Sequence, residues 1–486
     1  MNERLSPEPI LSAFDGFMGS IADLETSVVV GPAELKGVSA RLVTRLGRLG
    51  VGAGDRVALA VSNGPAFFAA LNAVLALGGS PLLLHADTPP AELRRTATRF
   101  GARFAVANTL EEAELHEAGF TTAAFSLSVW AGGILASLPE DAARGDFGLD
   151  GVPLHPTSGT TGEPKLAVRP GAAAVAEAEH YIETLGIEAD DLVLCSIPMS
   201  HAYGYGMCVM VPLLSGATIA TMPRFNAATA IRALREQPVS VYPAVPAVLD
   251  LLMFEGGDSL PVPRRCVTSA GAPLPKRTAE NVRRRWGLTV RPLYGTTETG
   301  GIAVARADHD PADVINVGPA MHGVATAIRS DEDGVVGEGG VGRLWIRSGS
   351  MMSGYLGPGG LDTSRLQDEW FDTGDLAHQD EQGNINLHGR ASEIINVFGN
   401  KVLPIEVEEV IAQLPEIVEV KVYPAPNRWG SHSVKAAIVV SNGLGEVEVK
   451  AHCRKHLIAY KRPEKIAILD KLPRSPAGKI VASQLP

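Results

Sequence analysis

Residues 157–165 combine side chains and backbone that suit the binding of phosphate groups. Their sequence is Thr-Ser-Gly-Thr-Thr-Gly-Glu-Pro-Lys. The two glycines let successive backbone N–H groups point at one anion, the hydroxyl groups add further donors, and Lys165 adds a positive charge. Pro164 stands where the common P-loop has a glycine before its lysine, so this is a different kind of phosphate loop. On these residues alone, an ordinary flexible surface loop is the alternative.

The same segment resembles the signature of the adenylate-forming superfamily, which includes acyl-CoA synthetases, the adenylation domains of peptide synthetases and firefly-type luciferases. Further motifs of this superfamily have counterparts in the same order along the chain, at residues 269–274, 294–298, 370–376, 389–390 and 473–480. The resemblance covers most of the chain, from Val57 to Ile480, and is closest to acyl- or aryl-CoA ligases. It implies that the chain activates a carboxylic acid with ATP.

The resemblance implies a role for residues in each motif. Lys479 would bridge the acid and the α-phosphate, and Glu298 and Thr160 would be catalytic and hold Mg²⁺. A carboxylate such as Asp375 suits the ribose because it accepts two hydrogen bonds at once. Taken alone, Glu298, Arg390 and Lys479 would each fit an ordinary solvated position. The implied ATP and AMP contacts are Thr157, Ser158, Gly159, Thr161, Gly162, Lys165, Gly271, Ala272, Pro273, Tyr294, Gly295, Thr296, Thr297, Asp375 and Arg390.

The acid itself is expected to bind in a pocket that the resemblance places beside these motifs. Gly300 and Gly301 are expected to leave room there for a long chain or a ring. No Asp or Glu stands between Asp191 and Glu236, where members that activate α-amino acids usually carry an acid. Because burying an unpaired ammonium is costly, a non-amino acid, aliphatic or aromatic, is favoured. The expected pocket residues are His201, which fits a packed core position equally well, Tyr203, Ala270, Gly300 and Gly301.

The C-terminal motifs imply a second half-reaction with a thiol. In the superfamily the small C-terminal domain rotates after adenylation and forms a tunnel for the thiol. Gly399 and Lys401 resemble the turn that lines this tunnel, although an ordinary hairpin turn fits them as well. The hinge position falls on Ser392, where the superfamily usually has an acidic residue.

The favoured function is ATP-dependent formation of an acyl-AMP, followed by transfer of the acyl group to the pantetheine thiol of CoA. The expected partners are a small carboxylic acid, ATP, Mg²⁺ and either CoA or the phosphopantetheine of an acyl carrier protein. One alternative is a stand-alone enzyme that loads an acyl or aryl group onto a carrier protein, and another is a luciferase-like oxygenating enzyme. A catalytically inactive nucleotide-binding protein is disfavoured because Glu298 and Lys479 are both present. The oligomeric state is open, with a homodimer among the alternatives.

Alternating strand-like and helix-like runs must position these residues. Runs at 57–61, 66–77, 81–84, 91–100 and 104–107, and later at 192–197 and 218–222, predict an α/β fold with largely parallel sheets. From about Gly337, short strands joined by Gly and Asp turns predict an antiparallel, β-barrel-like unit. The runs at 393–398, 405–413, 418–423, 433–440 and 446–457 predict a small mobile α+β domain. The expected domains are 1–390 and 391–486.

Composition narrows the class of protein. The 486 residues carry a net charge of −11, which argues against general attraction to nucleic acid or anionic membranes. The longest apolar stretch, residues 57–84, is interrupted by polar residues, so no membrane span is expected. The N-terminus has no apolar core of a secretory signal. The four cysteines are scattered, which fits free thiols in a reducing compartment, and the cytoplasm is the expected location.

Overall fold

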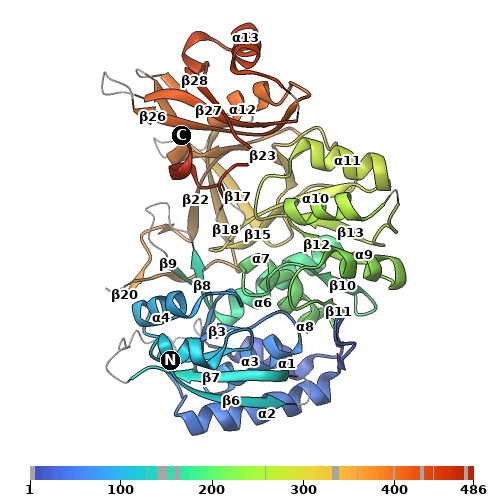
Figure 1. Ribbon diagram of the computed structural model, residues 1–486, viewed down its shortest axis with the longest axis vertical. Coiled ribbons are helices and arrows are strands. Elements are labelled where there is room, and N and C mark those ends of the chain that lie inside the picture. Colours follow the sequence, from blue (N-terminus) through green and yellow to red (C-terminus); the bar gives the residue numbers. More distant parts are fainter. Residues whose placement is uncertain are drawn as a thin grey trace.

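The computed structural model places two large sheets, a third antiparallel sheet and a small C-terminal unit along one long axis (Figure 1). The N-terminal and C-terminal residues lie toward opposite ends of this axis. The structure describes residues 6–127, 130–139, 151–157, 165–257, 259–330, 336, 339–357, 360–397, 400–426, 432–441, 443–474 and 480–486.

The first sheet has nine strands and carries the ends of the phosphate loop. Its central strands β3, β4 and β5 are parallel and fully buried, which explains their uninterrupted apolar sequences. The strands predicted at 57–61, 81–84 and 104–107 are thereby confirmed. In sheet order the strands are β20 (Gly360–Asp362), β19 (Gly354–Gly357), β9 (Lys165–Val168), β8 (Leu154–Thr157), β4 (Ser80–Leu83), β3 (Arg56–Ala60), β5 (Phe104–Ala107), β7 (Trp130–Ser137) and β6 (Thr121–Leu127).

The second sheet has eight strands, and most of them run parallel. The carboxyl ends of its parallel strands lie at one edge, where ligands of such sheets usually bind. In sheet order the strands are β15 (Gly300–Val304), β14 (Val290–Thr296), β13 (Cys266–Ser269), β12 (Val241–Ala244), β10 (Leu192–Cys195), β11 (Thr218–Thr221), β1 (Ile21–Asp23) and β2 (Val29–Val30).

Helices fill the space between these two sheets and cover their outer faces. Helix α3 is buried on almost every side, and one hydrophobic cluster joins its side chains to strands of both sheets. Within the described residues, no helix is both long and apolar enough to cross a membrane. The helices of this part are α1 (Glu8–Gly16), α2 (Pro32–Leu49), α3 (Pro65–Ala76), α4 (Pro90–Arg99), α5 (Glu112–Glu117), α6 (Gly171–Leu185), α7 (Ala202–Tyr205), the π-helix η3 (Gly206–Met210), α8 (Val211–Ser215), α9 (Ala227–Glu236), α10 (Pro246–Glu255) and α11 (Lys276–Trp286).

The third sheet is antiparallel, as the change of sequence texture near Gly337 predicted. It encloses a separate small core around Ile302, Leu344 and Ile385. Its strands are β16 (Asn316–Pro319), β23 (Asn384–Arg390), β22 (Trp370–Gln379), β18 (Gly342–Ser348) and β17 (Val324–Arg329), and β21 (Leu366–Gln367) pairs with β22.

The C-terminal residues form two small sheets over a core of their own. The predicted strand at 393–398 begins only at Ile395, because residues 391–393 form a 3₁₀ turn. The elements are η4 (Ala391–Glu393), β24 (Ile395–Val397), β25 (Asn400–Val402), α12 (Pro404–Ile411), β26 (Ile417–Pro426), β27 (His432–Val440), α13 (Glu446–His456), η5 (Ala459–Lys461), β28 (Lys465–Ile468) and η6 (Ala482–Gln484). The expected fold class, α/β with mixed sheets, an antiparallel unit and a small α+β unit, is confirmed.

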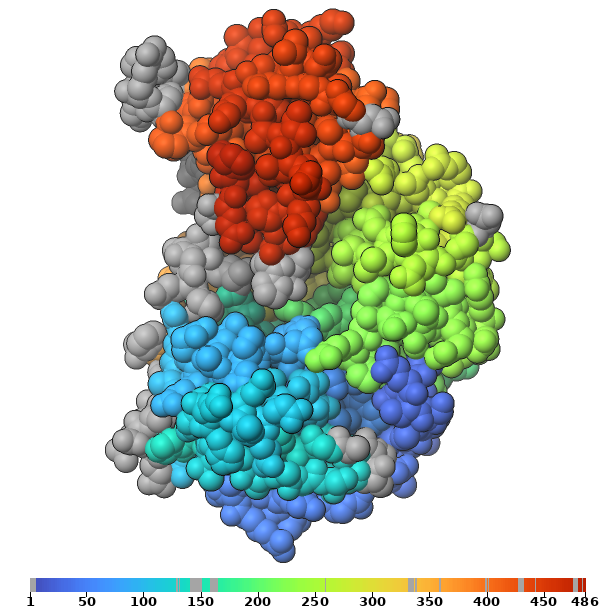
Figure 2. All heavy atoms as spheres, viewed as in Figure 1, coloured from blue at the N-terminus to red at the C-terminus, as the bar shows by residue number. Residues whose placement is uncertain are grey.

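The C-terminal unit, orange to red in Figure 2, stands beside the yellow-green surface of α10 and α11. Asp250 on α10 lies close enough to Glu419 and Arg474 of this unit to feel both charges. Burial raises the pKa of Asp250, Thr278 and Arg277 lower it, and Glu419 raises it. The C-terminal unit therefore packs against the larger part on this side.

Candidate functional site

The phosphate segment joins two neighbouring antiparallel strands. Thr157 ends β8 and pairs with Lys165 at the start of β9. The Lys165 ammonium lies 5.0 Å from the centre of the Tyr355 ring on the adjacent strand β19. Ser158, Gly159, Thr160, Thr161 and Gly162 lie outside the described residues. The structure therefore places the two ends of the expected phosphate loop.

Asp375, Arg390 and Tyr294 come together at the junction of the second and third sheets. Strands β22 and β23 pair Asp375 directly with Arg390, and Arg390 Nε lies 2.7 Å from Asp375 Oδ1. The Tyr294 hydroxyl donates to Asp375 Oδ2. Burial raises the pKa of Asp375, although Arg390 and the Tyr294 hydroxyl act in the opposite direction. One carboxylate oxygen is thus engaged in an ion pair and the other in a hydrogen bond, and a carboxylate with two such acceptor oxygens suits a pair of ribose hydroxyls.

Glu298 lies in the turn between β14 and β15 and is held by the loop that follows β18. Glu298 Oε1 accepts a hydrogen bond from the Tyr355 hydroxyl. The Met352 N–H donates to the Glu298 carbonyl at 2.6 Å, and the Ser350 hydroxyl donates to the Thr299 carbonyl at 2.6 Å. Burial and the Glu298 charge raise the pKa of Tyr355, so the phenol stays protonated as a donor. Tyr355 therefore links Glu298 to Lys165.

The other expected nucleotide residues follow the carboxyl ends of β13 and β14, which are parallel neighbours. Gly271, next to Ala272 and Pro273, has a φ of +83°, a conformation that favours glycine. Gly295 pairs with Gly301, and a Cβ on Gly295 would lie 2.4 Å from the Gly300 carbonyl oxygen. The two backbones therefore approach each other closely at this edge of the site. The hydroxyl of Thr296 lies 3.0 Å from that of Thr299, and Thr297 lies in the same turn.

The expected acyl-pocket residues lie around the same edge. His201 precedes α7, and the Tyr203 hydroxyl on α7 is 2.8 Å from the Thr268 hydroxyl of β13. Ala270 is 3% exposed at the end of β13. At Gly300 and Gly301 the structure differs from the expected open room, because the space that a Cβ would fill is occupied. The Glu177 carboxyl carbon lies 2.4 Å from that position at Gly300, and the Tyr181 ring and hydroxyl lie 2.7–2.8 Å from it at Gly301.

The C-terminal candidates are only partly placed. Ser392 is exposed in the 3₁₀ turn between the third sheet and the C-terminal unit. Lys401 is in strand β25, which pairs with β24, and its side chain lies outside the described residues. Gly399 and Lys479 also lie outside them. The described neighbours of the lysine loop, Arg474 and Ile480, form an antiparallel bridge.

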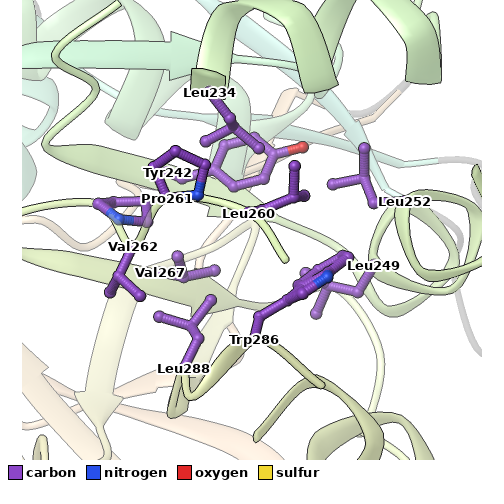
Figure 3. Close-up of a pocket in the computed structure, with 11 residues that line it drawn as sticks. Leu234, Tyr242, Leu249, Leu252, Leu260, Pro261, Val262, Val267, Trp286 and Leu288 are labelled. Atoms are coloured by element: carbon purple, nitrogen blue, oxygen red, sulfur yellow. The ribbon is translucent and has the colours of Figure 1, made fainter. Parts of the chain in front are cut away.

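An apolar hollow under α10 and α11 is a different feature from this site (Figure 3). Leucines, prolines, valines, Tyr242 and Trp286 line it, and several of them belong to the packed core of that layer. The Tyr242 hydroxyl accepts a hydrogen bond from the Ser196 hydroxyl. With space for only about one water molecule, the hollow is a packing defect of the core and holds no acid.

Among the described residues, no group of three or more His, Cys, Asp or Glu side chains could hold a metal. Mg²⁺ in nucleotide sites is commonly held by one or two carboxylates together with substrate phosphates. Glu298 has one oxygen engaged with Tyr355 and stands beside the end of the phosphate segment. A single carboxylate of this kind fits Mg²⁺ that arrives with ATP.

The comparison with known families decides how this arrangement is classified. Residues 33–356 match the AMP-binding enzyme family, and residues 406–479 match the AMP-binding enzyme C-terminal domain. The chain belongs to the AMP-binding enzyme family. The adenylate-forming superfamily expected from the motifs is thus confirmed, and its relatives here are AMP-forming acyl- and aryl-CoA ligases.

Two curated relatives and two solved structures illustrate this family. The indoleacetate–CoA ligase of Aromatoleum aromaticum is 31% identical over 67% of this chain and 64% of its own length. The long-chain-fatty-acid–CoA ligase FadD13 of Mycobacterium tuberculosis is 26% identical over 100% of this chain and 97% of its own. ATP-bound MatB of Rhodopseudomonas palustris is 24% identical with a TM-score of 0.83, covering 99% of this chain and 97% of that one. The o-succinylbenzoate coenzyme A synthetase of Bacillus subtilis, in complex with ATP and magnesium ion, is 24% identical with a TM-score of 0.82, covering 98% of each chain. At these identities the structures show a shared fold alone.

Sequence reasoning missed three residues of this AMP-binding enzyme that touch the candidate site. Tyr355 carried no signal beyond an aromatic residue after Gly354. Arg169 and Glu177 did carry one, because each charge stands in an otherwise apolar stretch, Leu-Ala-Val-Arg-Pro and an alanine-rich helix. A charge in such a stretch must be exposed or paired, and these two pair with one another.

Proposed function

We propose that this protein activates a non-amino carboxylic acid with ATP and passes the acyl group to the pantetheine thiol of CoA. In the first half-reaction a carboxylate oxygen of the acid attacks the α-phosphorus of ATP, and pyrophosphate leaves. In the second, the thiol sulfur attacks the acyl carbon of the acyl-AMP, and AMP leaves. No protein nucleophile is required in either step, so the residues act by positioning and by charge.

The observation that carries this proposal is the convergence of Tyr294, Asp375, Arg390 and Glu298 on one edge of the second sheet. Each comes from a motif that suggested a nucleotide role. An ion pair and a hydrogen bond join Tyr294, Asp375 and Arg390, and the Glu298 charge is close enough to act on Asp375 and Arg390. In the proposed complex the Tyr294 ring flanks the adenine, with Gly271, Ala272 and Pro273 nearby. Asp375 accepts the ribose hydroxyls and Arg390 lies beside the ribose and phosphate.

The phosphates need positive and hydrogen-bonding groups because both substrates are anions. Lys165 lies at the described end of the phosphate segment, and Thr160 and Thr161 are proposed to complete it. Mg²⁺ bound with ATP at Glu298 and Thr160 would neutralise part of the charge on the phosphates. Lys479 is proposed to contact both the carboxylate and the α-phosphate, since a lysine is a compact mobile cation.

CoA is proposed as the thiol acceptor, with a carrier-protein pantetheine as the competing acceptor. The relatives named as CoA ligases support CoA. The proposed tunnel uses the turn with Gly399 and Lys401, next to the described strand pair β24–β25. Rotation of the C-terminal unit about Ser392 would bring this turn to the adenylate.

The first test is acid-dependent exchange of labelled pyrophosphate into ATP across a panel of aliphatic and aromatic acids. We expect exchange with at least one acid and none without acid. Thioester formation is then measured with CoA and, separately, with a phosphopantetheinylated carrier protein. The absence of exchange with every acid would favour a non-catalytic nucleotide-binding protein. Thioester formation with the carrier protein but not with CoA would show that the carrier protein is the acceptor.

A second test separates the two half-reactions. Gly399→Leu should block thioester formation while pyrophosphate exchange stays close to that of the wild type, because the added side chain would fill the tunnel. Gly443→Leu, at an exposed glycine of the C-terminal unit with open space around it, is the matched control and should spare both steps. Equal loss of exchange and thioester formation in Gly399→Leu would refute the tunnel assignment.

A further inference from the structure

The chain between the third sheet and the C-terminal unit is short, and both of its ends are fixed. Arg390, the last residue of β23, pairs with Asp375 of β22, and its Nη1 also donates to the Thr373 carbonyl at 3.3 Å. On the other side, Ile395 begins β24 and is fully buried in the core of the C-terminal unit. Residues 391–394, which we call the joint, connect these two anchors.

The joint carries a side chain that contacts the C-terminal unit. Glu393 lies in the 3₁₀ turn η4, and its Oε2 is 3.2 Å from Lys421 Nζ on β26. Lys421 Nζ also lies 3.3 Å from Glu408 Oε1 on α12. The side chains of Lys421 and Glu408 are 21% and 14% exposed, whereas that of Glu393 is 47% exposed. One mostly buried cation therefore connects the exposed joint to two elements of the C-terminal unit.

Lys421 is charged, and the inner side of its contacts is firmly placed. Burial lowers the pKa of Lys421, but the charges of Glu408 and Glu393 raise it by more, so the pKa lies above its ordinary value. Glu408 Oε1 accepts a hydrogen bond from the Val422 N–H at 2.8 Å, which fixes this carboxylate against β26. Because Glu408 is fixed within the C-terminal unit, Lys421 offers Glu393 a partner that moves with that unit.

The contact of Glu393 shortens the part of the joint that is free to turn. Hinges are usually a few residues at the ends of elements whose φ and ψ angles absorb the change. With Glu393 held by the C-terminal unit, Ala391 and Ser392 are the residues that remain between the two anchors. The charge of Glu393 also acts on Asp375 and Arg390, so the joint lies beside the proposed ribose site. A turn about two residues allows fewer orientations than a turn about four.

We propose that Lys421 is a positioning residue for the rotation of the C-terminal unit, because its contact with Glu393 confines the rotation to Ala391 and Ser392. This inference rests on the proposed function, in which the C-terminal unit rotates between the two half-reactions. A confined joint limits the orientations that the unit samples. A larger fraction of molecules then has the lysine loop or the thiol tunnel at the adenylate, which raises the rate of the step that needs it.

The distribution of distances between two spin labels tests the inference without any catalysis. The four cysteines of the chain are buried, so labels can be attached at Glu255→Cys on α10 and Lys455→Cys on α13, two exposed positions on either side of the joint. We expect a broader distribution in Lys421→Met than in the labelled parent protein, because Glu393 is released. Lys421→Arg keeps the cation and should keep the narrow distribution. Equal widths in Lys421→Met and the parent would overturn the inference.

Two further variants separate this role from simple stabilisation of the C-terminal unit. Glu393→Gln weakens the same contact and leaves the pair of Lys421 and Glu408 intact, so it should broaden the distribution even if Lys421→Met unfolds the unit. Glu408→Gln is the matched control, because it weakens the same cluster but leaves Glu393 on Lys421, and it should keep the width of the parent. Equal broadening in Glu408→Gln and Glu393→Gln would show that the cluster only stabilises the unit, and would overturn the assigned role.

Steady-state thioester formation gives a second readout. We expect Lys421→Met to lower kcat by about two- to fivefold, the usual contribution of a partly exposed ion pair, and to leave KM for the acid unchanged. KM should stay the same because the joint positions the C-terminal unit and not the acid. A raised KM with an unchanged kcat would overturn the role of Lys421. The absence of thioester formation in the parent protein would refute the proposed function, and the distance distributions would still test the joint.

Discussion

Two arginine–carboxylate pairs of this AMP-binding enzyme share their chemistry and differ in their surroundings. Arg390 and Asp375 lie opposite one another on β22 and β23, the arginine side chain is 39% exposed, and Tyr294 completes the hydrogen bonds of the carboxylate. Arg169 and Glu177 have no exposure at all and leave several polar atoms unpaired. A pair with an accessible arginine can exchange contacts with a ligand, whereas a pair with both side chains buried is part of the core.

The two pairs should differ most in the free energy of unfolding that is lost when the arginine of each pair is replaced. Arg169→Met leaves Glu177 as an unpaired buried charge and should lower the free energy of unfolding by about 3–5 kcal/mol. Arg390→Met should cost less, because Asp375, although its side chain is only 10% exposed, keeps the hydrogen bond from the Tyr294 hydroxyl and some access to water. Urea unfolding of both variants, with Arg169→Met/Glu177→Leu as the rescued control, measures this contrast. Equal losses of stability in the two single variants would contradict the distinction.

Removal of Lys479 should lower the rate of catalysis without lowering the free energy of unfolding. Lys479→Ala would remove the cation that we propose acts in the transition state, and it should lower the pyrophosphate exchange rate by about 100-fold, roughly 3 kcal/mol. Lys471→Ala, an exposed lysine in the same C-terminal stretch, is the control and should exchange normally. Near-normal exchange by Lys479→Ala would refute the assigned role.

His180, which lies close enough to Arg169 to feel its charge, should make the stability of the protein sensitive to acid. Burial, followed by the charges of His322 and Arg169, lowers the pKa of His180 from 6.5 to about 4. Because the unfolded chain takes up this proton near pH 6.5 and the folded chain only near pH 4, the free energy of unfolding falls as pH is lowered across that window. The loss between pH 7 and pH 5 should reach about 2 kcal/mol.

His180→Gln is the variant that checks this acid sensitivity. Its free energy of unfolding, measured with urea at pH 7 and pH 5, should fall less between the two pH values than that of the wild type. His116→Gln, in an exposed hydrogen bond with Thr122, is the control and should keep the wild-type dependence. Identical pH dependence in His180→Gln and the wild type would exclude His180 as the source.

The smallest expected effect concerns the link between Glu298 and Lys165. Tyr355→Phe keeps the ring beside Lys165 and removes the hydroxyl that donates to Glu298. The loss of this one hydrogen bond should raise the Mg²⁺ concentration needed for half-maximal exchange by about fivefold, roughly 1 kcal/mol. Tyr460→Phe in the C-terminal unit is the control. If Tyr355→Phe changed the preference among acids and left the Mg²⁺ requirement unchanged, Tyr355 would belong to the acyl pocket and not to the Mg²⁺ site.

The two pairs also show what the sequence can predict. Asp375 and Arg390 stand in ordered motifs, and the strands at 57–61, 81–84 and 104–107 follow from apolar runs, so local patterns were sufficient for both. The Arg169–Glu177 pair depends on how α6 packs against β15 and the end of β9, which is a tertiary contact with no local pattern. The same packing explains why Gly300 and Gly301 gave the wrong expectation of open room, since the side chains that fill it come from α6.

We propose that Asp375, held by Arg390 and Tyr294, binds the ribose of ATP. Calorimetric titration with Mg-ATP in the absence of any acid tests it most directly, because no step of catalysis enters the measurement. Asp375→Asn should weaken ATP binding by about tenfold, the loss of one charge-assisted hydrogen bond, while Asp190→Asn at an exposed position should bind as the wild type does. Equal dissociation constants for Asp375→Asn and the wild type would contradict this role of Asp375.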